Sequence, residues 1–83
     1  MRKELYFKLL NYLWDLKEEN ENVFVDLRML EKDSREPVVV YINDGDERFY
    51  IDVMDENYNV EINGVNHLGI SFEEIKEGIE DVL

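Results

Sequence analysis

Cysteine is absent from the sequence, and proline, histidine and tryptophan each occur only once. Without cysteine the chain forms no disulfide bond, which is typical of cytoplasmic proteins. A zinc site is also disfavoured, because such sites are built mainly from Cys and His ligands. No apolar run reaches the roughly 18 residues that a transmembrane helix needs. These absences exclude the disulfide-stabilised and membrane-spanning classes, and we expect a cytoplasmic protein.

Basic residues are few, with nine Lys and Arg against 21 Asp and Glu, and the net charge is −12. Residues 1–42 hold seven basic and nine acidic side chains, whereas residues 43–83 hold two and twelve. The net charges of the two halves are therefore −2 and −10. Direct binding to nucleic acid is not expected, because phosphate contacts need Lys and Arg. The concentrated acidic charge is the main indication of function in the sequence.

Two helices are predicted, one at each end of the chain. Over residues 3–19 the apolar side chains recur at helical spacing. They are Leu5, Leu9, Tyr12, Leu13 and Leu16. Charged residues lie between them, so this segment is not expected to be a signal peptide. Ser71 and Glu74 form a capping box that starts the second helix. Its apolar stripe comprises Phe72, Ile75, Ile79, Val82 and Leu83.

Four strands are predicted between these helices from alternating apolar residues, at residues 23–30, 38–43, 48–54 and 58–63. The alternation predicts a sheet with one buried face and one wetter face. The order α-β-β-β-β-α predicts a single α+β domain spanning residues 1–83. Its architecture is an antiparallel four-stranded meander with the N-terminal and C-terminal helices packed on one face.

The stretch YINDGDERFY, residues 41–50, gathers three carboxylates around Gly45. Two hairpin registers keep the apolar residues on one face. A two-residue Asp44-Gly45 turn, a favoured type I′ pair, places Val40 opposite Phe49. A four-residue loop instead places Ile42 opposite Phe49. The hairpin explains the glycine without any site chemistry.

Metal binding and catalysis are not supported by this stretch. Its acids lack the spacing of an EF-hand loop. A catalytic carboxylate pair needs two acids in different environments, and a turn tip exposes both to solvent. His67 is expected to lie in a loop, without a nucleophile beside it. We therefore predict a protein that is not an enzyme, with no catalytic residue, metal or cofactor.

A protein-binding surface is the remaining hypothesis. The outward face of the sheet and its turns combine tyrosines with carboxylates, which suits a basic protein surface. The candidate partner-binding residues are Tyr41, Asp44, Asp46, Glu47, Tyr50, Asp52, Asp55, Glu56 and Glu61. The acids of the second helix form another candidate band. Carboxylates in rows can occupy Arg and Lys sites that otherwise hold phosphates, so we expect an inhibitor or nucleic-acid mimic.

The stretch INDGDERFYI and the acidic composition give a partial resemblance to known proteins. In layout the chain resembles the small acidic nucleic-acid-mimicking inhibitors of phage origin, such as some anti-CRISPR proteins. Those share an acidic sheet-and-helix build with a short Asn/Asp-Gly hairpin. The resemblance implies an anti-defence inhibitor, and it assigns no functional residue.

A second interface is predicted on the first helix. Phe7 and Trp14 lie one heptad apart and far from the centre of its apolar stripe. With Leu10 they form an aromatic face that could hold a partner or a second copy. The alternative function is therefore a small structural or assembly protein that dimerises through this face, so the chain is expected to be a monomer or a homodimer.

Overall fold

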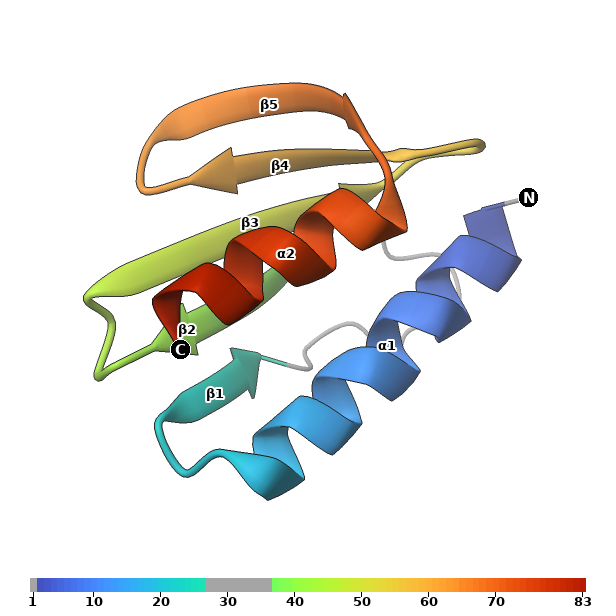
Figure 1. The fold of residues 1–83 in the computed structure, drawn as a ribbon. Helices are drawn as coiled ribbons and strands as arrows, with labels where there is room; N and C mark the ends of the chain where they lie inside the picture. Colours follow the sequence, from blue (N-terminus) through green and yellow to red (C-terminus); the bar gives the residue numbers. More distant parts are fainter. Residues whose placement is uncertain (1, 27–36) are drawn as a thin grey trace.

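The computed structural model describes residues 2–26 and 37–83, which form two helices and a five-stranded antiparallel sheet (Figure 1). The elements are α1 (Arg2–Glu19), β1 (Val23–Asp26), β2 (Val38–Ile42), β3 (Glu47–Val53), β4 (Tyr58–Ile62), β5 (Val65–Ile70) and α2 (Phe72–Val82). Neighbouring strands in the chain are neighbours in the sheet, in the order β1-β2-β3-β4-β5. The predicted α+β class, with a helix at each end of an antiparallel meander, is confirmed. Neither helix is long and apolar enough to cross a membrane.

The fifth strand is the main difference from the sequence prediction, which had four. β5 does not alternate between buried and exposed positions, because residues 65–69 are all exposed. It joins β4 through a two-residue turn at Asn63 and Gly64, whose φ angles are 50° and 89°. An Asn-Gly pair is a strong hairpin signal, so the sequence did indicate a further strand after residue 64. His67, expected in a loop, lies in β5 opposite Val60.

The first strand also differs in extent. The prediction ran over residues 23–30, whereas β1 comprises Val23–Asp26. The rest of the predicted strand, residues 27–30, lies outside the described residues. Val23 and Val25 are buried as expected.

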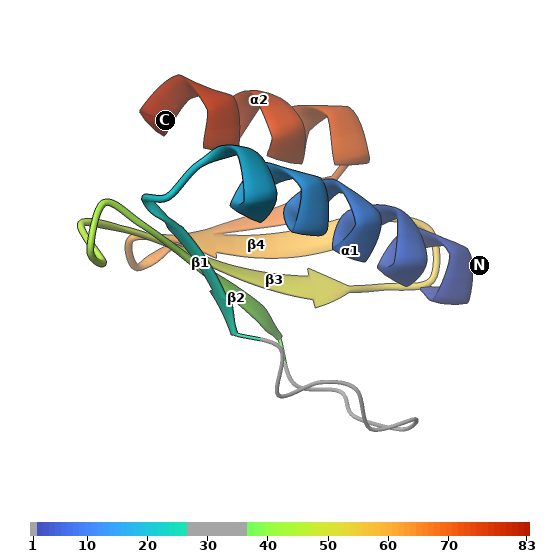
Figure 2. The same ribbon diagram turned by 90° about the horizontal axis from the view of Figure 1, so that it is seen from below.

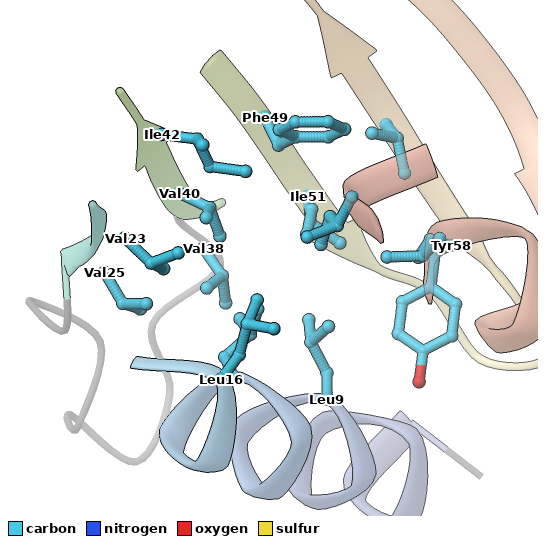
Figure 3. Close-up of a cluster of buried hydrophobic side chains, with 14 of the residues drawn as sticks. Leu9, Leu16, Val23, Val25, Val38, Val40, Ile42, Phe49, Ile51 and Tyr58 are labelled. Atoms are coloured by element: carbon cyan, nitrogen blue, oxygen red, sulfur yellow. The ribbon is translucent and has the colours of Figure 1, made fainter. Parts of the chain in front are cut away.

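Both helices cover one face of the sheet (Figure 2), which we call the inner face. α1 lies against β1 and β3, and α2 lies beside it toward β4. Among the described residues, the buried core is entirely apolar apart from the Tyr58 hydroxyl (Figure 3). Its members are Leu9, Leu13, Leu16, Val23, Val25, Val38, Val40, Ile42, Phe49, Ile51, Val53, Tyr58, Val60, Ile75 and Ile79. The predicted stripes of both helices thus supply the core, although Leu83 is 41% exposed.

The register of β2 and β3 decides between the two predicted hairpins. Val40 pairs with Phe49 and Val38 with Ile51, as the two-residue turn requires. Asp44 and Gly45 have φ angles of 58° and 91°, and the Asp46 N–H donates to the Asn43 carbonyl at 3.2 Å. These left-handed angles match the twist of the flanking strands, which is why an Asp-Gly pair suits the turn.

The start of α2 is capped as predicted. The Glu74 N–H donates to the Ser71 hydroxyl oxygen at 3.2 Å, and this hydroxyl donates to the Glu74 carboxylate at 3.1 Å. Phe72 then packs edge-on against Tyr12 of α1, with ring centroids 5.7 Å apart. The cap therefore starts α2 where its first aromatic ring can join the two helices.

Two tyrosine hydroxyls in the helix layer have different surroundings. The Tyr58 hydroxyl donates to the Leu5 carbonyl at 2.7 Å, which ties β4 to α1. The Tyr12 hydroxyl is buried without a hydrogen-bond partner among the described residues. Burial, together with the negative charge of Glu80, raises the pKa of Tyr12 to about 12. The Tyr12 hydroxyl therefore stays protonated at neutral pH.

We expect Tyr58→Phe to lower the free energy of unfolding by about 1 kcal/mol, because it leaves the Leu5 carbonyl without its buried donor. Tyr12→Phe is the matched control and should leave the stability unchanged or slightly increased. Urea denaturation of both variants tests this. Equal losses for the two substitutions would contradict the assignment of the Tyr58 bond.

Gly78 lies inside α2, where the structure leaves room for a side chain. A Cβ placed there would lie 3.9 Å from the nearest atom, Cε2 of Phe49, which is an ordinary van der Waals contact. The residue also lines a cavity of about 160 Å³ between α2 and the sheet. A methyl group would thus enter free space.

We expect Gly78→Ala to stabilise the protein by about 1 kcal/mol, because alanine restricts the unfolded chain and favours the helix. The midpoint of thermal or urea unfolding measures the change. A loss of stability would show that the helix cannot accept the methyl group at this position.

Candidate protein-binding surface

The face of the sheet opposite the helices, which we call the outer face, carries the candidate site. No described element covers it in Figure 2. The strand register places Asp26, Val39, Tyr50, Glu61 and Asn66 in one row across all five strands. The alternation that buries the apolar residues on the inner face therefore directs this row, which is polar or aromatic apart from Val39, outward.

Tyr50 stands at the centre of the acidic part of this face. Its ring is half-buried, with Asp52 two residues along the same strand and Glu61 directly opposite on β4. These three side chains line a shallow groove that continues to Asn66 and Leu68 of β5. The groove therefore offers an apolar ring between two carboxylates.

A second groove lies toward the β2–β3 turn. Phe24 and Tyr41 are cross-strand partners whose ring centroids are 6.1 Å apart. They line the groove together with Asp44 and Arg48. Arg48 donates its Nε–H to the Gly45 carbonyl at 3.2 Å. The only cation on this part of the described surface is thus held against the turn.

Glu47, predicted as part of the same surface, has a different position. It is in register with Phe49 and Ile51, so its side chain lies on the inner-face side of β3. The Asn63 amide donates to its carboxylate at 2.6 Å. Asn63 also accepts from the Arg48 N–H at 2.9 Å. Glu47 therefore joins the β2–β3 and β4–β5 turns, while Asp44 and Asp46 are exposed.

Two of the other predicted acids lie far from Asp44 and Asp46. Asp55 and Glu56 are exposed in the β3–β4 turn, at the opposite end of β3 from Asp44 and Asp46. The acids that sequence analysis grouped together therefore form three sets. One lies at each end of the sheet, and Asp52 and Glu61 lie between them.

The acidic band of α2 lies on the other side of the molecule from the outer face. Lysines accompany it there. Lys8 lies 4.7 Å from the centre of the Phe72 ring, and Lys76 lies 5.6 Å from that of Tyr12. The helix layer is therefore mixed in charge, whereas Arg48 is the one cation placed on the outer face among the described residues.

The predicted second interface is partly exposed. Phe7 and Trp14 of α1 are 51% and 53% exposed, and Leu10 between them is half-buried. The Lys17 ammonium lies 5.8 Å from the centre of the Trp14 ring. The two rings are thus available for contact, but a charged side chain already lies over one of them.

Four residues of the outer face were not among the predicted partner-binding residues. The alternation in VFVD could have found Phe24 and Asp26, because it places Val23 and Val25 inward and therefore the residues between and after them outward. Asn66 and Leu68 could be placed only once β5 was recognised. The Asn63-Gly64 pair was the signal for that strand.

Two further features bear on metal or ligand binding in the described residues. These residues hold no cluster of three or more His, Asp or Glu side chains arranged to bind a metal. His67 and Glu74 line the cavity beneath α2, but its other lining residues are apolar apart from Gly78. Comparison of the chain with protein-family models, curated proteins and solved structures finds no match.

We expect Asn63→Asp to lower the free energy of unfolding by about 1 kcal/mol, because the donor to Glu47 is replaced by a second carboxylate. Asn11→Asp, at an exposed site on α1, makes the same change in charge and is the control. Urea denaturation at neutral pH compares them. Equal stabilities would show that the Glu47–Asn63 contact does not hold the two turns together.

Proposed function

We propose that the protein is a non-catalytic binding module whose outer face docks on a basic surface of another protein. The partner is of the kind that handles nucleic acid, so that the module acts as an inhibitor or nucleic-acid mimic. The observation that carries the proposal is the uncovered outer face, where Tyr50 lies between Asp52 and Glu61. Asp44 and Asp46 extend the surface at one end, and Asp55 and Glu56 extend it at the other.

The chemistry of this face suits arginine and lysine. Carboxylates accept strong, charge-assisted hydrogen bonds from guanidinium and ammonium groups. The rings of Tyr50 and Tyr41 add apolar contact area and can receive the flat side of a guanidinium. A net charge of −12 also accelerates the encounter with a basic partner at low salt.

The outer face is a better candidate than α2 because only one cation of the described residues accompanies its acids, and this cation, Arg48, is held against the β2–β3 turn. On the helix side, lysines lie among the carboxylates, so a basic partner would meet repulsion as well as attraction. Acids also lie in the turns at both ends of the sheet, Asp44 and Asp46 at one end and Asp55 and Glu56 at the other. Spaced carboxylates of this kind are what a mimic of a phosphate backbone needs.

The alternative proposal is a structural protein that dimerises through Phe7, Leu10 and Trp14. The exposure of both aromatic rings supports it. Against it, the exposed charged residues Lys8 and Asp15 flank these rings and would be brought into the interface.

We expect Asp52→Asn combined with Glu61→Gln to weaken binding of an arginine-rich peptide about tenfold, or about 1.4 kcal/mol for two exposed ion pairs. Fluorescence anisotropy with the labelled peptide at low and moderate salt measures the affinity. The control is Glu18→Gln combined with Glu19→Gln on α1, which changes the net charge equally. If the control weakens binding as much, the peptide responds to net charge alone and the proposed site is wrong.

A further inference from the structure

β5 forms one edge of the sheet, and in Figure 1 no described element lies along its outer side. Val65 and Leu68 of this strand are 59% and 75% exposed. Leu68 is the most exposed of the large hydrophobic residues in the described structure. An apolar side chain on an open strand edge is a feature that native proteins normally avoid.

The backbone of β5 is oriented for a further strand. Ile62 pairs with Val65 across the two-residue turn, and Val60 pairs with His67. In such a hairpin these are the hydrogen-bonded pairs, so the intervening residue directs its N–H and C=O away from β4. Asn66 and, by the same alternation, Leu68 therefore present donors and acceptors to the open edge. The β-bulge at Gly69, where φ is 68°, ends this regular stretch.

Charge distinguishes this edge from the rest of the molecule. Residues 62–72 contain no Asp, Glu, Lys or Arg and form the longest uncharged run in the sequence. Edge strands usually carry a charged residue or a proline that prevents strand pairing. β5 has neither, whereas β1 at the other edge ends in Asp26.

We infer that β5 binds a second copy of this chain, joining the two sheets into one continuous antiparallel sheet. A two-fold interface brings a patch against itself, so two chains of charge −12 can meet closely only where the patch is neutral. β5 meets this requirement. A basic partner would be drawn to the carboxylates elsewhere. Pairing Asn66 of one copy with Leu68 of the other satisfies the outward backbone groups of both.

The dimer has a consequence for the outer face. Antiparallel pairing about a two-fold axis normal to the sheet keeps the two outer faces on the same side. The groove that holds Tyr50, Glu61 and Leu68 reaches β5, so it continues into the second copy. The inferred dimer does not depend on the proposed function. If both hold, the dimer doubles the length of the proposed docking surface.

The experiment is sedimentation of the purified protein from micromolar to millimolar concentration, at low and high salt. We expect a monomer–dimer equilibrium that tightens as salt screens the repulsion between the two acidic chains. Leu68→Lys should weaken the dimer about tenfold or more, because it removes apolar contact and places a charge in the interface. Asn66→Pro should also weaken it, because proline removes an outward N–H that the monomer does not use.

Trp14→Lys is the matched control, since it places the same charge on the exposed face of α1. It should leave the dimer unchanged. Amide hydrogen exchange should show Asn66 and Leu68 protected at high protein concentration and exposed at low concentration. A wild-type protein that stays monomeric throughout overturns the inference, as does a dimer that Trp14→Lys dissociates and Leu68→Lys does not. The dimer and the proposed docking surface can fail independently. Dimerisation is expected to strengthen with salt, whereas binding of the arginine-rich peptide is expected to weaken with salt.

Discussion

One-sided burial of the sheet is the constraint on which the rest of the structure depends. In β2, and in β3 from Phe49 onward, every second side chain is apolar and buried, and both helices lie on that side. A shift of one residue in either hairpin would send Phe49 and Ile51 into water and bring Tyr50 and Asp52 into the core. The apolar core thus fixes which residues form the outer face.

The left-handed turns make this constraint specific. Asp44-Gly45 and Asn63-Gly64 both adopt positive φ angles that other residue pairs adopt at a cost. They lie at the same end of the sheet, where Asn63 links Glu47 to the Arg48 backbone. Part of the acidic charge that suggests a partner is therefore used within the protein. Glu47 serves the fold, while Asp44 and Asp46 remain exposed.

The distribution of charge gives the molecule three different surfaces. The outer face is aromatic and acidic, the helix layer mixes acids with lysines, and the β5 edge is neutral and apolar. The acidic outer face suits a basic partner, because the charges are opposite. Two copies of the chain repel each other, so the neutral β5 edge is the surface on which they can make close contact. The two interactions can be told apart, because salt should weaken binding of a basic partner and strengthen contact between two acidic copies.

Sequence alone determined the two helices, the capping box, β2 to β4 and the inward positions of the core, because burial imposes the 3.6- and 2-residue periods. It also restricted the β2–β3 hairpin to two registers. It did not reveal β5, because an edge strand with little burial has no alternation. Only the tertiary structure decided the register, the separation of Asp55 and Glu56 from Asp44 and Asp46, and the inward position of Glu47. These depend on which strands pair and where the helices pack, and such contacts join residues far apart in the chain.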